Sequence, residues 1–395
     1  MKRKVYMDYA STTPVRPEVA EAMIPYIKEE FGNPQSLHSF GDKPKQAVDE
    51  ARVKVAELIG ALQEEIYFTS SGTESDNFAL KGIALAHQKK GKHIITSEIE
   101  HHAVLHSAKS LEKLGFEVTY VPVDKFGLID PQQVRSAIRK DTILVSIVHA
   151  SNEVGTIEPI EEISKVVKEA GVIFHTDALQ TAGTIPVSVN ALGVDLMSLA
   201  AHQFYGPKGV AAIYIRKGIR ITPFIDGGVQ ENGRRAGTEN VPAIAGMGKA
   251  CELAKSEIPG RVEALTKLRD KFIQGLLSKI EHAYLNGHPT KRLPGNVNIS
   301  FEYIEGESML LFLNIEGVAA SSGSACTSRA LKASHVLTAM GVPPEIAQGS
   351  LLFSLGAGNS VEDIDYVCQI LPPIVERLRK MSPLYEEASK AGKGK

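Results

Sequence analysis

The sequence predicts an α/β fold, with a large domain built on a mainly parallel, seven-stranded sheet and a smaller α+β C-terminal domain. Two observations predict it. Seven short β-branched runs, apolar at successive positions, alternate with amphipathic segments, which is typical of strands covered by helices on both faces. The 395 residues also exceed the size at which a single core stops growing. The seven runs are EIYFTS, HIITSE, EVTYVPV, TILVSIVHA, VIFHTD, DLMSLA and VAAIYIRK.

Helices are expected on both sides of this block. Residues 17–31 begin with a proline, which suits a first helical turn, and residues 44–59 end at Gly60, a typical C-terminal glycine. After Pro259 the pattern changes to a smaller α+β unit, and the final EEASKAGKGK is expected to be frayed. We predict a large domain over 15–258 and a small domain over 1–14 and 259–395. Within the latter we expect helices at 260–281, 307–314 and 361–379 and strands in GNVNISFEY and GSLLFSLG.

The composition is that of a globular protein, with 43% hydrophobic and 23% charged residues and a net charge of −2. The sequence has no basic face of the kind that would predict nucleic-acid binding. It also has no apolar run long enough to predict a membrane span or a signal peptide, so we expect a cytoplasmic protein. The cysteines, Cys251, Cys326 and Cys368, form neither a disulfide framework nor a CxxC zinc motif. Cys251 and Cys368 occupy apolar helical positions and are predicted core residues.

Polar clusters follow several of the predicted strands, where open α/β sheets place their ligand sites. In TSSGTESDN a small-residue turn opens a helix, which suits either a bound phosphate or a plain helix cap. Asp177 ends a buried strand and would suit a cationic partner such as a pyridinium nitrogen, or a hydrogen-bonding role. His101 and His102 are adjacent and face different directions on a helix, so a shared metal is not expected, but one of them could stack on a flat cofactor.

Nine motifs in order resemble a cysteine desulfurase of the housekeeping iron–sulfur cluster type. This is a pyridoxal-phosphate (PLP) family with the class V aminotransferase fold. The resemblance runs from Val5 to about Tyr385, and it implies an aspartate aminotransferase-like PLP-transferase fold. The motifs are DYASTTP, GNPQSLHSFG, FTSSGTESDN, EHHAV, HASNEVGTI, FHTDALQTAG, HQFYGPKG, GRRAGTEN and SSGSACTS.

The resemblance implies a role for each matching residue. Cys326 would attack the substrate's sulfur and carry it as a persulfide, although a small residue in a tight turn is the alternative reading of this position. The remaining residues would bind PLP. Gly72, Thr73 and His202 would hold its phosphate, Thr238 would reach the phosphate of the neighbouring subunit, His101 would stack on the ring, Asp177 would pair with the ring nitrogen, and Asn152 and Gln180 would bond the phenolic oxygen.

Three positions depart from the family pattern. Gln203 stands where the family has the lysine that forms the Schiff base with PLP, and an amide nitrogen is not nucleophilic. Lys208, in GPKG, is no obvious replacement, because the family has a lysine there as well. Ala200 replaces a phosphate-binding serine, and Leu352 replaces the arginine that binds the substrate's carboxylate. A missing proton-transfer group typically costs about 10²–10⁴ in rate, so turnover of free cysteine by this chain alone is expected to be inefficient.

Two functions therefore remain open. The first is a desulfurase that binds PLP without a covalent link, converts cysteine to alanine and passes a Cys326 persulfide to a cluster scaffold protein. The second is a non-catalytic homodimeric platform that docks the scaffold and supplies Cys326 as sulfur acceptor or as ligand of a shared 2Fe-2S cluster. MSPLYEE, residues 381–387, resembles the family's C-terminal docking segment under either reading. A selenocysteine lyase is a weaker alternative, against which the short cysteine loop argues.

Overall fold

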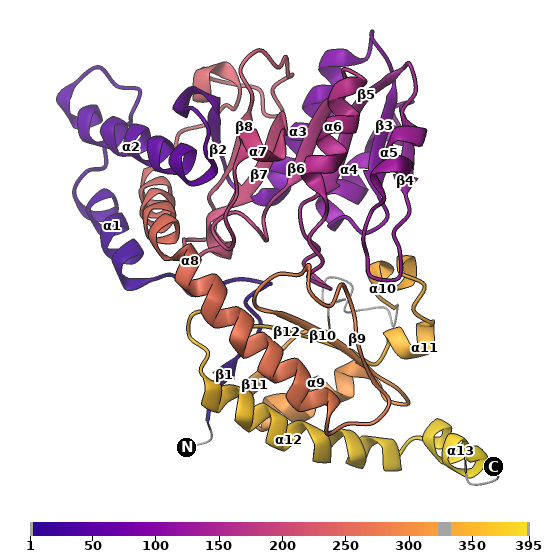
Figure 1. The fold of residues 1–395 in the computed structure, drawn as a ribbon. Helices are drawn as coiled ribbons and strands as arrows, with labels where there is room; N and C mark the ends of the chain where they lie inside the picture. Colours follow the sequence, from indigo (N-terminus) through magenta and orange to yellow (C-terminus); the bar gives the residue numbers. More distant parts are fainter. Residues whose placement is uncertain (1–2, 323–332, 393–395) are drawn as a thin grey trace.

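The computed structural model describes residues 3–322 and 333–392. Its largest sheet has seven strands in the order β2-β8-β7-β6-β5-β3-β4 (Figure 1). Each strand falls within one of the seven predicted runs, which confirms the predicted sheet. The strands are β2 (Ile66–Thr69), β3 (His93–Ser97), β4 (Glu117–Val121), β5 (Thr142–Val148), β6 (Ile173–Asp177), β7 (Leu196–Ala200) and β8 (Ala211–Ile215).

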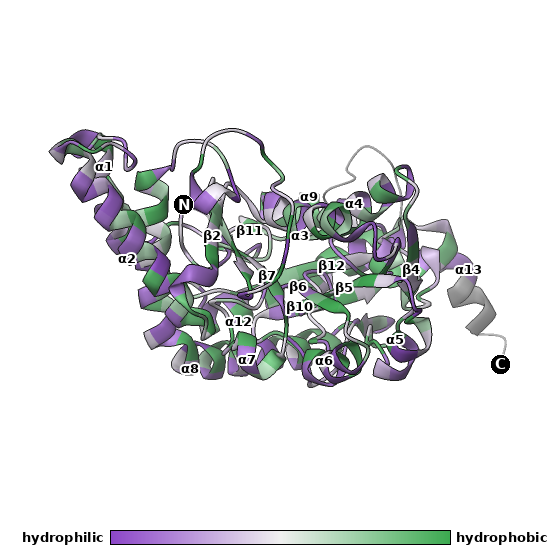
Figure 2. Cartoon of the chain, turned by 90° about the horizontal axis from the view of Figure 1, so that it is seen from above, coloured by the Kyte–Doolittle hydropathy of each residue, from purple (hydrophilic) through white to green (hydrophobic). Residues whose placement is uncertain are grey.

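Helices cover both faces of this sheet, as the apolar runs predict. Along β3, the side chain of Ile94 belongs to the hydrophobic cluster that contains residues of α3 and α4. The side chain of its neighbour Ile95 belongs to the hydrophobic cluster on the other face of the sheet. Figure 2 shows the helices as layers on either side of the strands. The helices are α1 (Pro17–Lys28), α2 (Asp42–Ile59), α3 (Gly72–His87), α4 (His102–Glu112), α5 (Pro131–Ala137), α6 (Ile160–Glu169), α7 (Val189–Leu192) and α8 (Val241–Leu277), with 3-10 turns η1 (Ser39–Gly41) and η2 (Gln63–Glu65).

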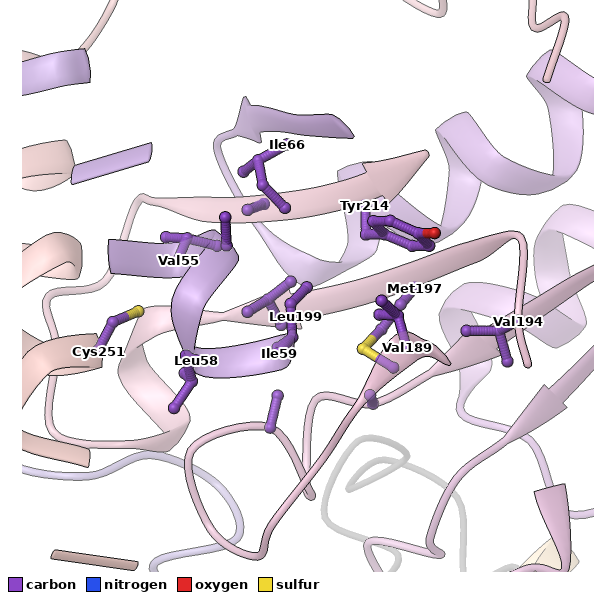
Figure 3. Packing of buried hydrophobic residues seen from close by; sticks show 14 of the residues in the cluster. Val55, Leu58, Ile59, Ile66, Val189, Val194, Met197, Leu199, Tyr214 and Cys251 are labelled. Atoms are coloured by element: carbon purple, nitrogen blue, oxygen red, sulfur yellow. The ribbon is translucent and has the colours of Figure 1, made fainter. Parts of the chain in front are cut away.

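The larger core lies between the sheet and helices α2, α6 and α8. Figure 3 shows Ile59 of α2 beside Leu199 of β7, with Cys251 of α8 at the edge of the same cluster. Cys251 is 1% exposed, and burial raises the pKa of its thiol. Cys368 is also buried, so both predictions of core cysteines are confirmed.

A second unit contains a three-stranded sheet, β12-β10-β9, and a two-stranded parallel sheet of β1 and β11. Its strand β1, near the N-terminus, pairs with Val318 and Ala319, so the first residues do pack against the C-terminal part of the chain. Its elements are β1 (Val5–Tyr6), β9 (Ala283–Leu285), β10 (Asn296–Phe301), α9 (Gly306–Ile315), β11 (Val318–Ala319), α10 (His335–Ala339), α11 (Pro344–Ala347), β12 (Ser350–Ser354), α12 (Val361–Lys380) and α13 (Pro383–Gly392).

Two predicted elements differ from the structure. The predicted helix at 260–281 is the second half of α8, which begins at Val241 and continues through Pro259. The helix is continuous because its first half packs into the larger core, through Met247 and Cys251, and its second half packs into the smaller one, through Phe272. The tail prediction was wrong up to residue 392, because α13 is helical. Our division at 258/259 therefore falls inside one helix and stays a proposal.

Among the described residues, none of the helices combines the length and the apolar character needed to span a bilayer.

Candidate active site

Six of the seven strands of the large sheet end at the same edge. Strands β3, β4, β5, β6 and β7 are parallel, and β2 has their direction because β2 and β7 each pair antiparallel with β8. The loops that follow these strands therefore meet at one edge, the usual ligand position in such sheets. We call this set the binding edge: Gly72 and Thr73 after β2, His101 after β3, Asn152 after β5, Asp177 and Gln180 at the end of β6, and His202 after β7.

The start of α3 combines a helix cap with free donors. The Ser71 Oγ accepts a hydrogen bond from the Glu74 N–H at 3.1 Å, which confirms the cap reading of this turn. The N–H groups of Gly72 and Thr73 have no acceptor within the described residues. A Cβ added to Gly72 would lie 2.1 Å from Leu179 Cδ2, so a larger residue here would require the Leu179 side chain to move. Two unpaired donors at the positive end of a helix make a suitable anion site.

Thr238 lies beside this turn in the same chain. It lines a cavity of about 130 Å³ together with Ser70, Glu231 and Arg235. Arg235 Nε donates to Glu74 Oε1 at 2.8 Å, which ties the loop to the first turn of α3. The Thr238 side chain is exposed, as a group that contacts a second subunit would be. A single chain leaves that predicted contact untested.

Asp177 is buried, 5% exposed, and its Oδ1 accepts a hydrogen bond from the Leu179 N–H at 2.9 Å. Burial raises the pKa of Asp177, whereas His101 and the Leu179 N–H lower it. His101 caps α4, with its Nδ1 accepting a hydrogen bond from the Ala103 N–H at 3.1 Å. A buried carboxylate costs free energy unless a cation or hydrogen bonds compensate it, so this position favours a cationic partner.

The turn after β7 is the 3-10 helix η3 (Ala201–Gln203). His202 Nδ1 is buried and has no hydrogen-bond partner. Burial, with the charge of Lys208, lowers the pKa of His202, so the ring is neutral at neutral pH. Gln203 Nε2 donates to the Ala10 carbonyl oxygen at 3.2 Å, and Gln180 Nε2 donates to the same oxygen at 3.1 Å. The two amides share one acceptor and line one cavity of about 50 Å³.

Comparison with known proteins assigns this arrangement to a family. The family model described as aminotransferase class-V matches residues 5–367. The chain belongs to this family. It is 58% identical to the cysteine desulfurase IscS of Dictyoglomus turgidum, with 98% of each chain covered. It is 59% identical to the IscS of Methanosarcina thermophila, with 97% of this chain and 94% of the relative covered. A solved NifS-like protein superposes with a TM-score of 0.90 at 41% identity, covering 95% of this chain and all of the other.

These relatives place the chain among the IscS-type cysteine desulfurases of the class, as the motifs predict, and confirm the PLP-transferase fold. PLP is the cofactor expected of class-V aminotransferases. The residues at the binding edge fit it. Gly72 and Thr73 offer unpaired donors for a phosphate, His202 has an orphaned Nδ1, and Asp177 is a buried carboxylate that suits a ring nitrogen. His101, Asn152 and Gln180 share this edge, and Thr238 lies beside it, but the roles of these four residues stay predictions.

Two of the departures from the desulfurase pattern, Ala200 and Gln203, lie at the end of β7 beside His202, and the third, Leu352, lies on β12 of the smaller sheet. We call Ala200, Gln203 and Leu352 the altered face. Leu352, 3% exposed, stands opposite Asn298 in the β10–β12 pair, so both side chains share one face of that sheet. Its neighbours Leu351 and Phe353 point into the smaller core, but Leu352 belongs to none of the hydrophobic clusters among the described residues. An apolar side chain thus occupies a face that otherwise carries Asn and Ser residues. These are Asn296, Asn298, Ser300, Ser350 and Ser354.

Three buried polar residues escaped sequence reasoning. Glu100 and Asp76 are fully buried carboxyls, and burial is the largest effect that raises the pKa of each. The charge of Asp177 raises both pKa values, and Glu100 also raises that of Asp76. His175 lies two residues before Asp177 on β6. The spacing of His175 and Asp177 indicates a shared face of the strand. No sequence signal shows which helical residue covers that face.

Cys326, the predicted sulfur carrier and possible cluster ligand, lies outside the described residues. Within residues 3–322 and 333–392, no group of three or more His, Cys, Asp or Glu side chains is arranged to hold a metal ion.

Proposed function

We propose that this chain is a cysteine desulfurase-type protein of iron–sulfur cluster assembly that binds PLP without a covalent link. Its relatives carry the name cysteine desulfurase. One observation supports the binding of PLP without a covalent link. At the position of the family's lysine, the Gln203 amide is hydrogen-bonded to Ala10, while the predicted PLP ligands Gly72, Thr73, His101, Asn152, Asp177, Gln180 and His202 are all present at the binding edge. Binding and covalent attachment are thus separated in this chain.

In this proposal, each residue of the binding edge contacts a different part of the cofactor. The start of α3 and His202 hold the phosphate, Asp177 holds the ring nitrogen, and His101 covers the ring. Asn152 and Gln180 bond the phenolic oxygen, and an exposed Thr238 completes the phosphate site of a second subunit in a homodimer. When bound, PLP supplies an electron sink that weakens the bonds at the substrate's α-carbon.

Sulfur transfer belongs to Cys326. Its thiolate attacks the sulfur of cysteine, the carbon–sulfur bond breaks, and the sulfur remains on Cys326 as a persulfide while the carbon product takes a proton and leaves as alanine. The persulfide passes to a scaffold partner in the cytoplasm, docked near residues 381–387. No external oxidant is needed, because the substrate's carbon is reduced as the enzyme's sulfur is oxidised.

A second candidate is the non-catalytic platform, in which the homodimer docks the scaffold and Cys326 accepts sulfur or ligates a shared 2Fe-2S cluster. The altered face favours it. Gln203 cannot replace an amine, and Leu352 presents a hydrocarbon where the family binds the substrate's carboxylate.

One experiment separates the two. The purified chain, with added PLP and cysteine, is assayed for alanine and sulfide beside Cys326→Ala and a Gln203→Lys, Leu352→Arg double variant. We expect slow alanine formation by the unmodified chain, loss of sulfide in Cys326→Ala, and a rate about 10²–10⁴-fold higher in the double variant. Alanine formation only in the double variant would instead establish the platform.

A further inference from the structure

A second carboxyl group, Asp76, lies near Asp177. Asp76, in the second turn of α3, is 0% exposed, and neither of its oxygens makes a hydrogen bond of normal geometry within the described residues. The nearest potential cation is His175, whose Nε2 lies 3.7 Å from Asp76 Oδ1. The helix thus places a carboxyl with two unsatisfied oxygens against the strand that carries Asp177.

His175 does not supply a positive charge. Its ring is fully buried, and it bridges two serine hydroxyls, with Nδ1 at 2.8 Å from Ser146 Oγ and Nε2 at 3.0 Å from Ser198 Oγ. Burial lowers the pKa of His175 to about 3, so the ring is neutral at neutral pH. The serines lie on β5 and β7, and Ser198 stands directly opposite Asp177 in the sheet.

The other ionisable groups around Asp76 are negative. Asp177 on β6 and Glu100, in the loop after β3, both disfavour ionisation of Asp76, and burial is the largest of the effects that raise its pKa well above the ordinary value. Only the Ser198 hydroxyl, on β7, favours the ionised form. Asp76, Asp177 and Glu100 cannot all ionise in one buried region without a large cost in free energy, so at least one of them keeps its proton.

The two carboxyls are not equivalent. Asp177 accepts a hydrogen bond from the Leu179 N–H and lies within the influence of His101, whereas Asp76 has neither a backbone donor nor a cation. We propose that Asp76 is a positioning residue of the ring pocket, buried as a neutral acid so that Asp177 alone carries the negative charge toward the ring nitrogen. The inference rests on the proposed PLP site, but its first test does not.

The first test is infrared spectroscopy of the wild-type chain labelled with ¹³C-aspartate. A protonated carboxyl has a C=O stretch that a carboxylate lacks, and the label identifies it as aspartate. We expect this band at neutral pH in the wild type and in Asp177→Asn, and its loss in Asp76→Asn. When the pH is raised, the band of Asp177→Asn should disappear at a lower pH than the band of the wild type, because the charge of Asp177 no longer disfavours ionisation of Asp76. Absence of the band from the folded wild type overturns the proposal.

The second test is titration of each variant with PLP, followed by absorbance. Asp76→Asn preserves a neutral polar side chain of the same size, so its PLP affinity should stay within about threefold of the wild type, against a loss of about tenfold or more in Asp177→Asn. Equal losses in the two variants would mean that Asp76 acts as a carboxylate, which overturns the proposal. If Asp76→Asn does not fold, Asp76→Ser provides the same comparison. Failure of the wild type to bind PLP would refute the proposed cofactor site and leave the infrared result on Asp76 intact.

Discussion

The binding edge and the altered face satisfy their polar groups in opposite ways. At the binding edge, Asp177 is buried with its charge uncompensated by any ion pair among the described residues, and His202 Nδ1 has no partner. On the altered face, Gln203 donates to a backbone carbonyl within the chain, and Leu352 has no polar group to satisfy. The binding edge therefore leaves polar groups free for a ligand, whereas the altered face needs no ligand to satisfy its polar groups.

The difference teaches that binding and reaction are separable in this fold. Ligand sites keep buried polar atoms unsatisfied at a cost in folding free energy, because the ligand later compensates it. Where the reactive lysine and arginine are absent, such a cost has no purpose, and neutral side chains can occupy the positions. Substitutions in the binding edge and in the altered face should therefore change different properties.

The largest effect is expected from the ion pair that supports the loop of Thr238. Arg52 forms two bonds to Glu231, at 2.6 and 2.7 Å, and the Glu231 side chain is 2% exposed. Glu231→Ala leaves the largely buried Arg52 guanidinium with the Ile66 carbonyl oxygen but without its carboxylate partner, so the free energy of unfolding should fall by about 3–5 kcal/mol. Urea denaturation measures it. The exposed pair of Arg139 and Glu117 is the matched control, because Glu117→Ala should cost about 1 kcal/mol or less. Equal losses in the two variants would contradict a binding edge supported by buried charge.

The second effect is a pH dependence of stability at Glu100, the residue before His101. Burial raises the pKa of Glu100 to about 8, although Ser97 Oγ and the Val148 N–H donate to it. A raised pKa means that the folded state favours the neutral acid, so stability is lost as the pH rises from the ordinary glutamate value toward 8. In Glu100→Gln this loss, at most about 1.4 kcal/mol per pH unit, should disappear.

The measurement for Glu100 is urea denaturation of both proteins at several pH values. Their free energies of unfolding should converge at acidic pH and diverge in favour of Glu100→Gln toward mildly alkaline pH. Parallel curves for the two proteins would show that Glu100 is ionised in the folded state.

The sheet and the binding edge were predictable from the sequence because their signals are local. A strand such as β6 is indicated by its apolar run, which ends at Asp177 and is followed within three residues by Gln180. Helix α8 was not predicted as one element, because Pro259 signals an end locally while packing against two cores keeps the helix continuous.

Contacts between distant segments could not be predicted either. Gln203 and Ala10, which share a hydrogen bond, are 193 residues apart in the sequence. Asp76 faces His175 only because α3 covers that part of the sheet. Both contacts depend on how separate elements pack, and no residue pattern within either segment indicates the partner.

The third effect is expected at Asp177. Asp177→Asn removes the charge that would hold the ring nitrogen, and a hydrogen bond to a charged group contributes about 1.5–3 kcal/mol. The dissociation constant of PLP should therefore rise by about one to two factors of ten. Absorbance titration measures it, with Leu352→Asn as the control on the altered face. A larger loss of PLP affinity in Leu352→Asn would contradict the separation of the two regions.

The smallest and sharpest effect compares the two glutamines that share the Ala10 carbonyl oxygen. Gln180 belongs to the binding edge and Gln203 to the altered face, yet each donates one amide hydrogen bond to the same atom, at 3.1 and 3.2 Å. Because the two bonds are chemically alike, Gln180→Ala and Gln203→Ala should each lower the free energy of unfolding by about 0.5–1.5 kcal/mol. Only Gln180→Ala should also weaken PLP binding, since only Gln180 is assigned to the phenolic oxygen. Thermal unfolding and PLP titration of both variants separate the effects, and a weaker affinity in Gln203→Ala would show that the amide at the lysine position has become a cofactor ligand itself.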